Sequence, residues 1–162
     1  LDFLDQHDLA VAQARGLASG PLWFSEYGLQ LSRGFRALKV WLSFKEHGLD
    51  KFGRLIDQNI AQSHELAALV RARPELELMA PVVLNIVCFR YRAPGTPEAE
   101  LNRLNEELLI RLHESGIAAP SYTTLGGRYC LRAAISNHRT QSPDLQMMVD
   151  AVVKIGGSLP GG

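Results

Sequence analysis

The 162-residue sequence has no long apolar run and no excess of charge of either sign. No stretch approaches the roughly 20 consecutive apolar residues that a membrane-spanning helix requires. Seventeen lysines and arginines balance seventeen aspartates and glutamates, so there is no overall positive field to attract nucleic acid or an anionic membrane. We therefore expect neither nucleic-acid nor membrane partners.

Cysteine is also scarce, since Cys88 and Cys130 are the only two and each lies within an apolar run. Two cysteines without CxxC spacing form neither a disulfide framework nor a zinc-site pattern. The simplest interpretation is a pair of buried free thiols in a reducing, cytoplasmic environment.

Recognisable metal and nucleophile motifs are missing too. The five histidines are scattered and none forms an HExxH-type pair. They are His7, His47, His64, His113 and His138. No GxSxG elbow and no glycine-rich phosphate loop of the GxxxxGK[ST] or GxGxxG type occurs. The motifs therefore predict neither a metal site nor a phosphate-binding loop.

The length and a hydrophobic content of 46% fit one compact domain with a real core. Residues 1–31 show no sustained hydrophobic period and are interrupted by glycine and proline, which predicts a connecting arm ahead of a folded domain over 32–162. The first residue is Leu1, with no signal-peptide pattern after it, and this favours a segment of a longer protein.

Four helices are predicted from apolar residues at spacings of three and four. Capping residues, prolines and glycines set their expected limits. These limits are Ser32 to Gly48, Asp50 to Pro74, Thr96-Pro97 to Gly116, and Ser142-Pro143 to Gly156-Gly157. The first helix has so many apolar side chains that we expect it to be mostly buried.

Three strands are predicted from β-branched and aromatic residues. The run 82–89 is apolar on both faces, as in a covered central strand. Residues 121–125 and 128–135 form a hairpin, because the dipeptide Gly126-Gly127 between them tolerates the positive φ angles of tight turns. Helices that alternate with a few strands predict an α+β fold, a small and mostly antiparallel sheet with helices packed on it.

Arg132 is the most informative polar residue in these strands. Strand alternation separates Arg128, Cys130 and Arg132 from Tyr129, Leu131, Ala133 and Ile135, which lie on the other face. An arginine in an apolar strand requires an anion, and a guanidinium can bind a carboxylate through two parallel hydrogen bonds. The pattern alone leaves two alternatives, an internal ion pair, which it favours, or a site for a substrate carboxylate.

Several segments, in order along the chain, resemble the C-terminal domain of group II pyridoxal-phosphate-dependent amino-acid decarboxylases, the family of the aromatic-L-amino-acid, histidine and glutamate decarboxylases. The resemblance spans about residues 22–155. Its segments are Leu31-Ser32-Arg33-Gly34-Phe35-Arg36-Ala37-Leu38-Lys39-Val40-Trp41, Phe44 to Gly48, Asn59 to Glu65, Val87-Cys88-Phe89-Arg90, Leu131 to Asn137, and Thr140. Gly34 departs from the family, which usually has a second arginine after Arg33.

The resemblance implies a homodimeric lyase of the fold-type I, aspartate-aminotransferase-like class. In such enzymes a large domain holds the cofactor and this small domain closes over the active site. The lysine that forms the imine with pyridoxal phosphate would lie upstream, because none of the lysines here matches its context. These are Lys39, Lys45, Lys51 and Lys154. The chain alone is therefore expected to be inactive and to bind no cofactor; its partners would be the large domain, the dimer mate and a small amino acid.

The resemblance also bears on single residues. Arg132 matches an arginine that contacts a substrate carboxylate in glutamate-type members and in related aminotransferase-fold enzymes, which reverses the preference given by the strand pattern. The mobile catalytic loop of the family would rejoin near Phe24 or Tyr27, while Arg33 and Arg36 would be structural or interface charges.

The resemblance implies that the helix around Trp41 normally packs on the large domain or the dimer mate, so it should expose apolar surface in this chain. The substrate stays open among aromatic amino acids, histidine and glutamate. The alternative function is a self-standing α+β interaction or small-acid-sensing module, which a start codon just before Leu1 would favour.

Overall fold

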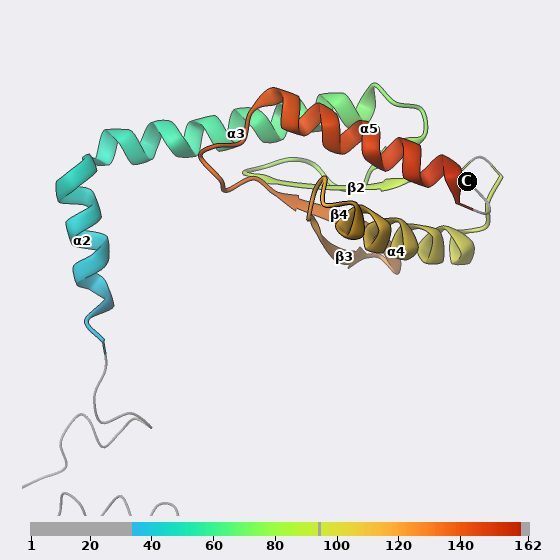
Figure 1. Cartoon of the computed structure of the whole chain (residues 1–162), viewed down its shortest axis with the longest axis horizontal. Coiled ribbons are helices and arrows are strands. Elements are labelled where there is room, and N and C mark those ends of the chain that lie inside the picture. Colours follow the sequence, from blue (N-terminus) through green and yellow to red (C-terminus); the bar gives the residue numbers. More distant parts are fainter. Residues whose placement is uncertain (1–33, 94, 160–162) are drawn as a thin grey trace, which may run out of the picture. The chain divides into compact units, whose positions relative to one another are not determined.

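The computed structural model describes residues 34–93 and 95–159 (Figure 1). The chain separates into two compact units after Glu46, and each is described by itself. The predicted arm over 1–31, with Phe24 and Tyr27, lies outside the described residues, as does Arg33. No helix in the described part of the chain is long and apolar enough to cross a membrane.

Helix α2 (Arg36–His47) accounts for nearly all of the described part of the first unit. It begins at an exposed Arg36, so the helix starts later than the Ser32 cap predicts. None of its residues is buried, and Trp41 is 56% exposed with the Lys45 ammonium 5.7 Å from its ring. The prediction of a mostly buried helix is wrong for this chain, because the apolar side chains of α2 stay exposed.

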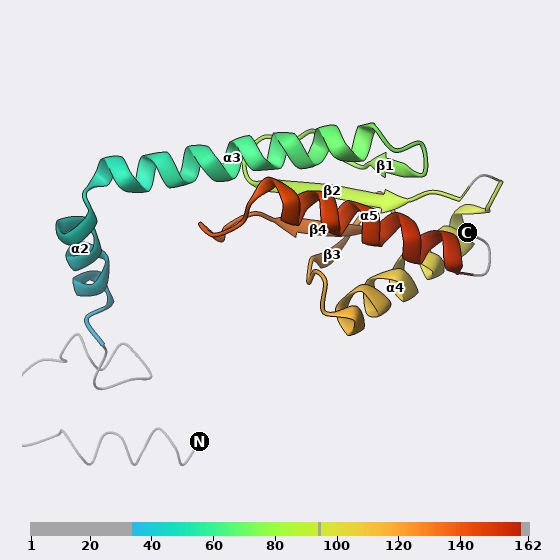
Figure 2. The same ribbon diagram turned by 45° about the horizontal axis from the view of Figure 1, so that its top comes forward.

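The second unit is a four-stranded antiparallel sheet with three helices (Figures 1 and 2). Its elements are α3 (Leu49–Arg71), β1 (Leu76–Leu78), β2 (Ile86–Tyr91), α4 (Glu98–Ser115), β3 (Ser121–Leu125), β4 (Arg128–Ala134) and α5 (Ser142–Ser158). The strand order is β1-β2-β4-β3. This architecture confirms the predicted α+β fold.

The core lies between the sheet and the helices. Alternate strand residues such as Val87, Phe89 and Leu131 are fully buried and share one cluster with apolar residues of α3, α4 and α5. Helix α5 contacts both α3 and α4, and Figure 2 shows α3 continuing past the sheet at its N-terminal end. The side chains between these positions, including Cys88 and Arg132, point to the other side, which is called the helix-free face below.

The central strand is shifted relative to its prediction. Strand β2 begins at Ile86, whereas Val83 and Leu84 are 79% and 62% exposed in the connection that precedes it. The prediction of a strand starting at residue 82 is therefore wrong, because a continuous apolar run does not mark where pairing begins. Strand β1, which pairs with β2 over three residues, was not predicted.

Glycine positions explain where several elements end. Gly126 and Gly127 have φ angles of 57° and 79°, which confirms the hairpin turn, and Gly116 ends α4 in the left-handed region as predicted. Gly156 was predicted to end α5 but lies inside it. A Cβ there would come within 2.4 Å of the Tyr91 ring, so this glycine serves close packing rather than helix termination.

The predicted caps of two further helices also change. Gly48 rather than Asp50 is the N-cap of α3, and Asp50 lies in the first turn, where a carboxylate interacts favourably with the helix dipole. Helix α4 begins at Glu98 after a Pro97 N-cap, so Thr96 is not the cap. Helix α5 begins at Ser142-Pro143 as predicted, and its N-cap is Gln141, whose backbone N–H donates to the Asp144 carboxylate at 2.9 Å.

Candidate functional site

Two arginines on adjacent strands share the helix-free face but differ in their surroundings. Arg90 lies on β2 and Arg132 on β4, and the antiparallel register places Cys88 opposite Arg132. Strand alternation places both side chains on the face of the sheet opposite the apolar core.

Arg90 is neutralised within the chain. It is only 2% exposed, and its Nε and Nη2 donate to Glu77 Oε2 at 2.9 and 2.7 Å. A second carboxylate, that of Glu98, also pairs with its guanidinium. Burial by itself would lower the pKa of Arg90, but the bonds to Glu98 and Glu77 outweigh burial and raise it, while Arg90 lowers the pKa of Glu98. Arg90 therefore joins β1, β2 and the start of α4.

Arg132 is half-buried and has no carboxylate within 4.0 Å among the described residues. Its Nη1 donates a long hydrogen bond of 3.4 Å to Ser121 Oγ on β3, the strand next to β4. The internal ion pair that the strand pattern favoured is thus not formed with any described residue. Among the described residues, the Ser121 hydroxyl is the only hydrogen-bond partner of this guanidinium.

A polar cavity of about 410 Å³ lies beside Arg90 and is also lined by Arg92 and Arg128. Arg128 Nε is 3.7 Å from Glu98 Oε1, so Arg128 shares this carboxylate with Arg90. Arg128 therefore has a carboxylate partner and Arg132 has none among the described residues, although both lie on the same strand and the same face.

The two cysteines lie between these arginines and are free thiols. Cys130 is fully buried and its thiol donates to the Thr123 carbonyl at 3.3 Å, whereas Cys88 is half-buried. Burial, reinforced by the neighbouring Cys88 thiol, raises the pKa of Cys130 to about 11. Cys130 is thus held as a neutral thiol at physiological pH.

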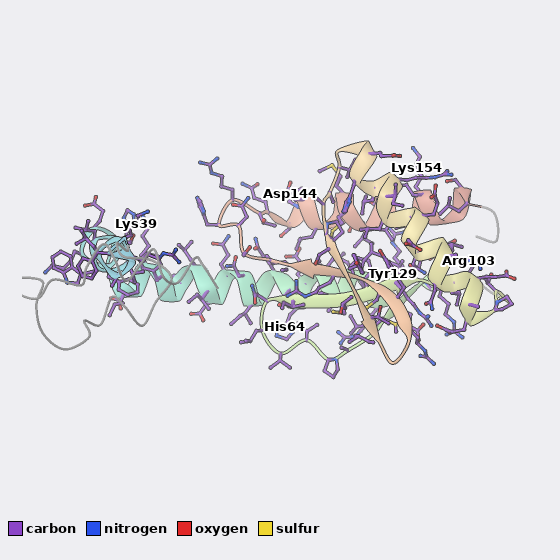
Figure 3. All side chains as sticks on the ribbon, turned by 90° about the horizontal axis from the view of Figure 1, so that it is seen from below. Lys39, His64, Arg103, Tyr129, Asp144 and Lys154 are labelled. Atoms are coloured by element: carbon purple, nitrogen blue, oxygen red, sulfur yellow. The ribbon has the colours of Figure 1, made fainter. Side chains whose placement is uncertain are left out.

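Two asparagines of α4 hold the strands that carry the site. The fully buried Asn105 bonds both the N–H and the C=O of Tyr91, at 2.7 and 2.8 Å. Asn102 does the same for the hairpin, bonding Gly127 O at 2.9 Å and Tyr129 N at 2.8 Å (Tyr129 is labelled in Figure 3). Sequence reasoning missed these roles, although Asn105 follows Leu101 and Leu104 on the apolar side of the predicted helix.

No described lysine or histidine of the second unit lies on a strand. All four lysines are exposed and lie on helices, including Lys39 on α2 and Lys154 on α5 (Figure 3). Lys154 lines a separate cavity with Met147 and Asp150. Within the described ranges, no group of three or more histidine, cysteine, aspartate or glutamate side chains could hold a metal ion.

The sequence is similar to those of known proteins. The profile of the pyridoxal-dependent decarboxylase conserved domain matches residues 22–92. The chain is 36% identical over 132 residues to the aromatic-L-amino-acid decarboxylase of Bacillus atrophaeus, covering 80% of this chain and 28% of that protein. Its identity to tyrosine decarboxylase 4 of Petroselinum crispum is 31% over 121 residues, covering 72% and 24% respectively. This profile and these relatives support a group II pyridoxal-phosphate-dependent decarboxylase domain in the chain.

Solved structures of this decarboxylase class share the fold as well. The crystal structure of Oryza sativa TDC with PLP and tryptamine matches with a TM-score of 0.74 and 27% identity, over 83% of this chain and 29% of that chain. The glutamate decarboxylase domain of a Vibrio parahaemolyticus protein matches with a TM-score of 0.69 and 27% identity, over 76% and 26%. These neighbours confirm the predicted fold-type I assignment. The chain spans 24–29% of the length of these four relatives.

The positions of the lysines bear on pyridoxal phosphate, the cofactor named for the Oryza sativa structure. The cofactor needs a lysine amine for its imine, and no lysine lies on the strands that carry Arg132. Lys154, on α5, belongs to the helical layer on the other side of the sheet.

Proposed function

We propose that this chain is the C-terminal small domain of a longer pyridoxal-phosphate-dependent amino-acid decarboxylase, here called the parent enzyme. The fold, the family profile and the short share of each relative that the chain covers support this proposal. The large domain of the same polypeptide would hold the cofactor and its lysine, and the enzyme would work as a cytoplasmic homodimer.

Arg132 would bind the carboxylate of the amino-acid substrate. The observation that carries this role is its contrast with Arg90, since Arg90 is saturated by two carboxylates and Arg132 by none of the described ones. A guanidinium on an open sheet face, with donors to spare, is suited to bidentate binding of a carboxylate.

The remaining surfaces would complete the enzyme. The helix-free face, which is not used for the domain's own core, would close against the large domain and bring Arg132 to the active site. The exposed apolar side chains of α2 would pack on the large domain or on the dimer mate. In the chain alone these surfaces lack their partners, and without the cofactor lysine it would be inactive.

The substrate class we propose is aromatic L-amino acids. The support comes from relatives whose names include aromatic-L-amino-acid, tyrosine and tryptophan decarboxylases. Carbon dioxide release by the parent enzyme can be measured with a panel of four amino acids. The panel consists of L-tyrosine, L-tryptophan, L-histidine and L-glutamate.

The role of Arg132 is tested by the kinetics of the parent enzyme. Arg132→Met should lower kcat/KM for the best amino acid of the panel by roughly 10- to 100-fold, since a hydrogen-bonded charge contact is lost. Arg128→Met is the matched control on the same strand and face, and it should leave kcat/KM nearly unchanged because Arg128 is engaged near Glu98. Equal kcat/KM for Arg132→Met and the unmodified enzyme would rule out substrate binding by Arg132.

A further inference from the structure

We infer that Ser121 is a positioning residue that sets the direction of the Arg132 guanidinium. This inference rests on the proposed function, because it concerns how Arg132 presents its donors to a substrate carboxylate. Ser121 does not itself contact the substrate in this proposal.

The two residues are directly opposed across the β3 and β4 strands. Ser121 Oγ donates to the carbonyl oxygen of Arg132 at 3.1 Å, and Arg132 Nη1 donates back to Ser121 Oγ at 3.4 Å. A single hydroxyl thus links the backbone and the guanidinium of one arginine.

The proton count of the hydroxyl fixes the direction of both bonds. A serine hydroxyl has one hydrogen and two lone pairs, and here the hydrogen is committed to the Arg132 carbonyl. Only the lone pairs then face the guanidinium, which is the arrangement a cationic donor requires. Ser121 can therefore hold Arg132 without neutralising its charge, in contrast to the two glutamates that hold Arg90.

The strand that carries Ser121 is well placed for this task. Strand β3 is joined to β4 by the Gly126-Gly127 turn, and Asn102 anchors that turn to α4. A long arginine side chain with no other described partner loses considerable rotamer freedom when it binds a ligand. Prior restraint by a fixed hydroxyl would reduce that loss and strengthen substrate binding.

A purely structural role of the hydroxyl makes a different prediction. The backbone pairing of β3 with β4 covers five residue pairs and does not depend on the Ser121 side chain. A structural serine would change stability alone, whereas a positioning serine changes the affinity for a ligand that carries a carboxylate.

The experiment uses the parent enzyme with Ser121→Ala, Ser121→Thr and the control Thr124→Ala. Thr124 lies on the same strand with its side chain on the other face, so its replacement removes a hydroxyl that does not approach Arg132. For the best amino acid of the panel of four, Ser121→Ala should raise KM about three- to tenfold with little change in kcat. Ser121→Thr keeps the hydroxyl and should restore KM, and Thr124→Ala should match the unmodified enzyme.

The outcomes separate this inference from the proposed function. An unchanged KM in Ser121→Ala, while Arg132→Met still loses kcat/KM, would overturn the positioning role and leave the function of Arg132 intact. A KM that rises equally in Ser121→Ala and Ser121→Thr would also overturn it, because the hydroxyl would then not matter. If Arg132→Met has no effect, or none of the four amino acids is decarboxylated, the proposed function fails and this inference fails with it.

Discussion

Arg90 and Arg132 show at the scale of single residues how neighbouring carboxylates decide what an arginine does. Both lie on the helix-free face of one sheet, and each belongs to a segment that resembles the decarboxylase family. Arg90 pairs with Glu77 and Glu98, which come from β1 and the start of α4. Arg132 bonds only the hydroxyl of Ser121 among the residues that the structure describes. The difference arises from tertiary placement of the acids, which strand alternation does not reveal.

Replacement of Arg90 by methionine should destabilise the second unit. The two carboxylates left behind are 29% and 47% exposed at their side chains, so water can partly solvate them. We therefore expect a loss of about 1–3 kcal/mol in the free energy of unfolding, below the ~3–5 kcal/mol of a fully buried pair. Urea denaturation followed by far-ultraviolet circular dichroism measures this loss. Tryptophan fluorescence would not report on this unit, because Trp23 and Trp41 both lie outside it.

Glu98→Gln is the matched control for this change. It leaves Arg90 bonded to Glu77 through both Nε and Nη2, so the loss should be smaller, about 1 kcal/mol or less. A urea midpoint for Arg90→Met equal to that of the unmodified chain would show that the clamp contributes nothing to stability.

Cys130 should make the chain sensitive to alkali. Its pKa is about 11 when folded, while an unfolded cysteine has a pKa of roughly 8.5. Between these values the unfolded chain has lost the thiol proton that the folded chain keeps, so stability falls as pH rises from about 9 to 11. Urea midpoints measured across this range should fall less steeply for Cys130→Ala. An identical slope in both proteins would contradict the raised pKa.

At the scale of secondary structure, α5 depends on a glycine for its contact with the sheet. Gly156→Ala would place a Cβ 2.4 Å from the Tyr91 ring, so one of the two must move. Overpacking of this kind costs about 1–3 kcal/mol in the free energy of unfolding, measurable by urea denaturation. Gly157→Ala is the control, since its Cβ would meet only Tyr91 Oη at 3.7 Å and it should be neutral or stabilising. Equal losses in both variants would show that the Tyr91 contact is not the cause, because helix propensity favours alanine at both positions.

The elements that sequence predicts best are those with local chemical markers. The hairpin follows from Gly126-Gly127 and the end of α4 from Gly116, because positive φ angles select glycine. Gly156 misleads the same reasoning, since the Tyr91 ring that excludes a side chain there comes from β2, far away in sequence. Strand β1 has only three residues, too few for a periodic signal.

At the scale of the whole molecule, helix α2 exposes several large apolar side chains. Its large apolar side chains are 40–56% exposed. They are Leu38, Val40, Trp41, Leu42 and Phe44. We expect the purified chain to self-associate or to bind an apolar dye, which light scattering and dye fluorescence measure. A clean monomer without dye binding would contradict a surface built for another domain or subunit.

The candidate site follows from the sequence only in part. Alternation in β4 correctly separates Arg132 from the core residues, and the resemblance to decarboxylases singles it out. The pairing of Ser121 with Arg132 follows the register of the two-residue hairpin. The bonds of Asn105 to both backbone groups of Tyr91 depend on tertiary packing, which neither the alternation nor the resemblance shows.

The most direct test of the account compares the parent enzyme with this chain alone in the presence of pyridoxal phosphate. Carbon dioxide release from L-tyrosine, L-tryptophan, L-histidine and L-glutamate would be measured, and bound cofactor would be trapped with borohydride. The account predicts that the parent enzyme decarboxylates at least one amino acid and traps the cofactor on a lysine outside this chain, while the chain alone does neither. Decarboxylation by the chain alone, or a stable cofactor adduct on one of its four lysines, would contradict the account.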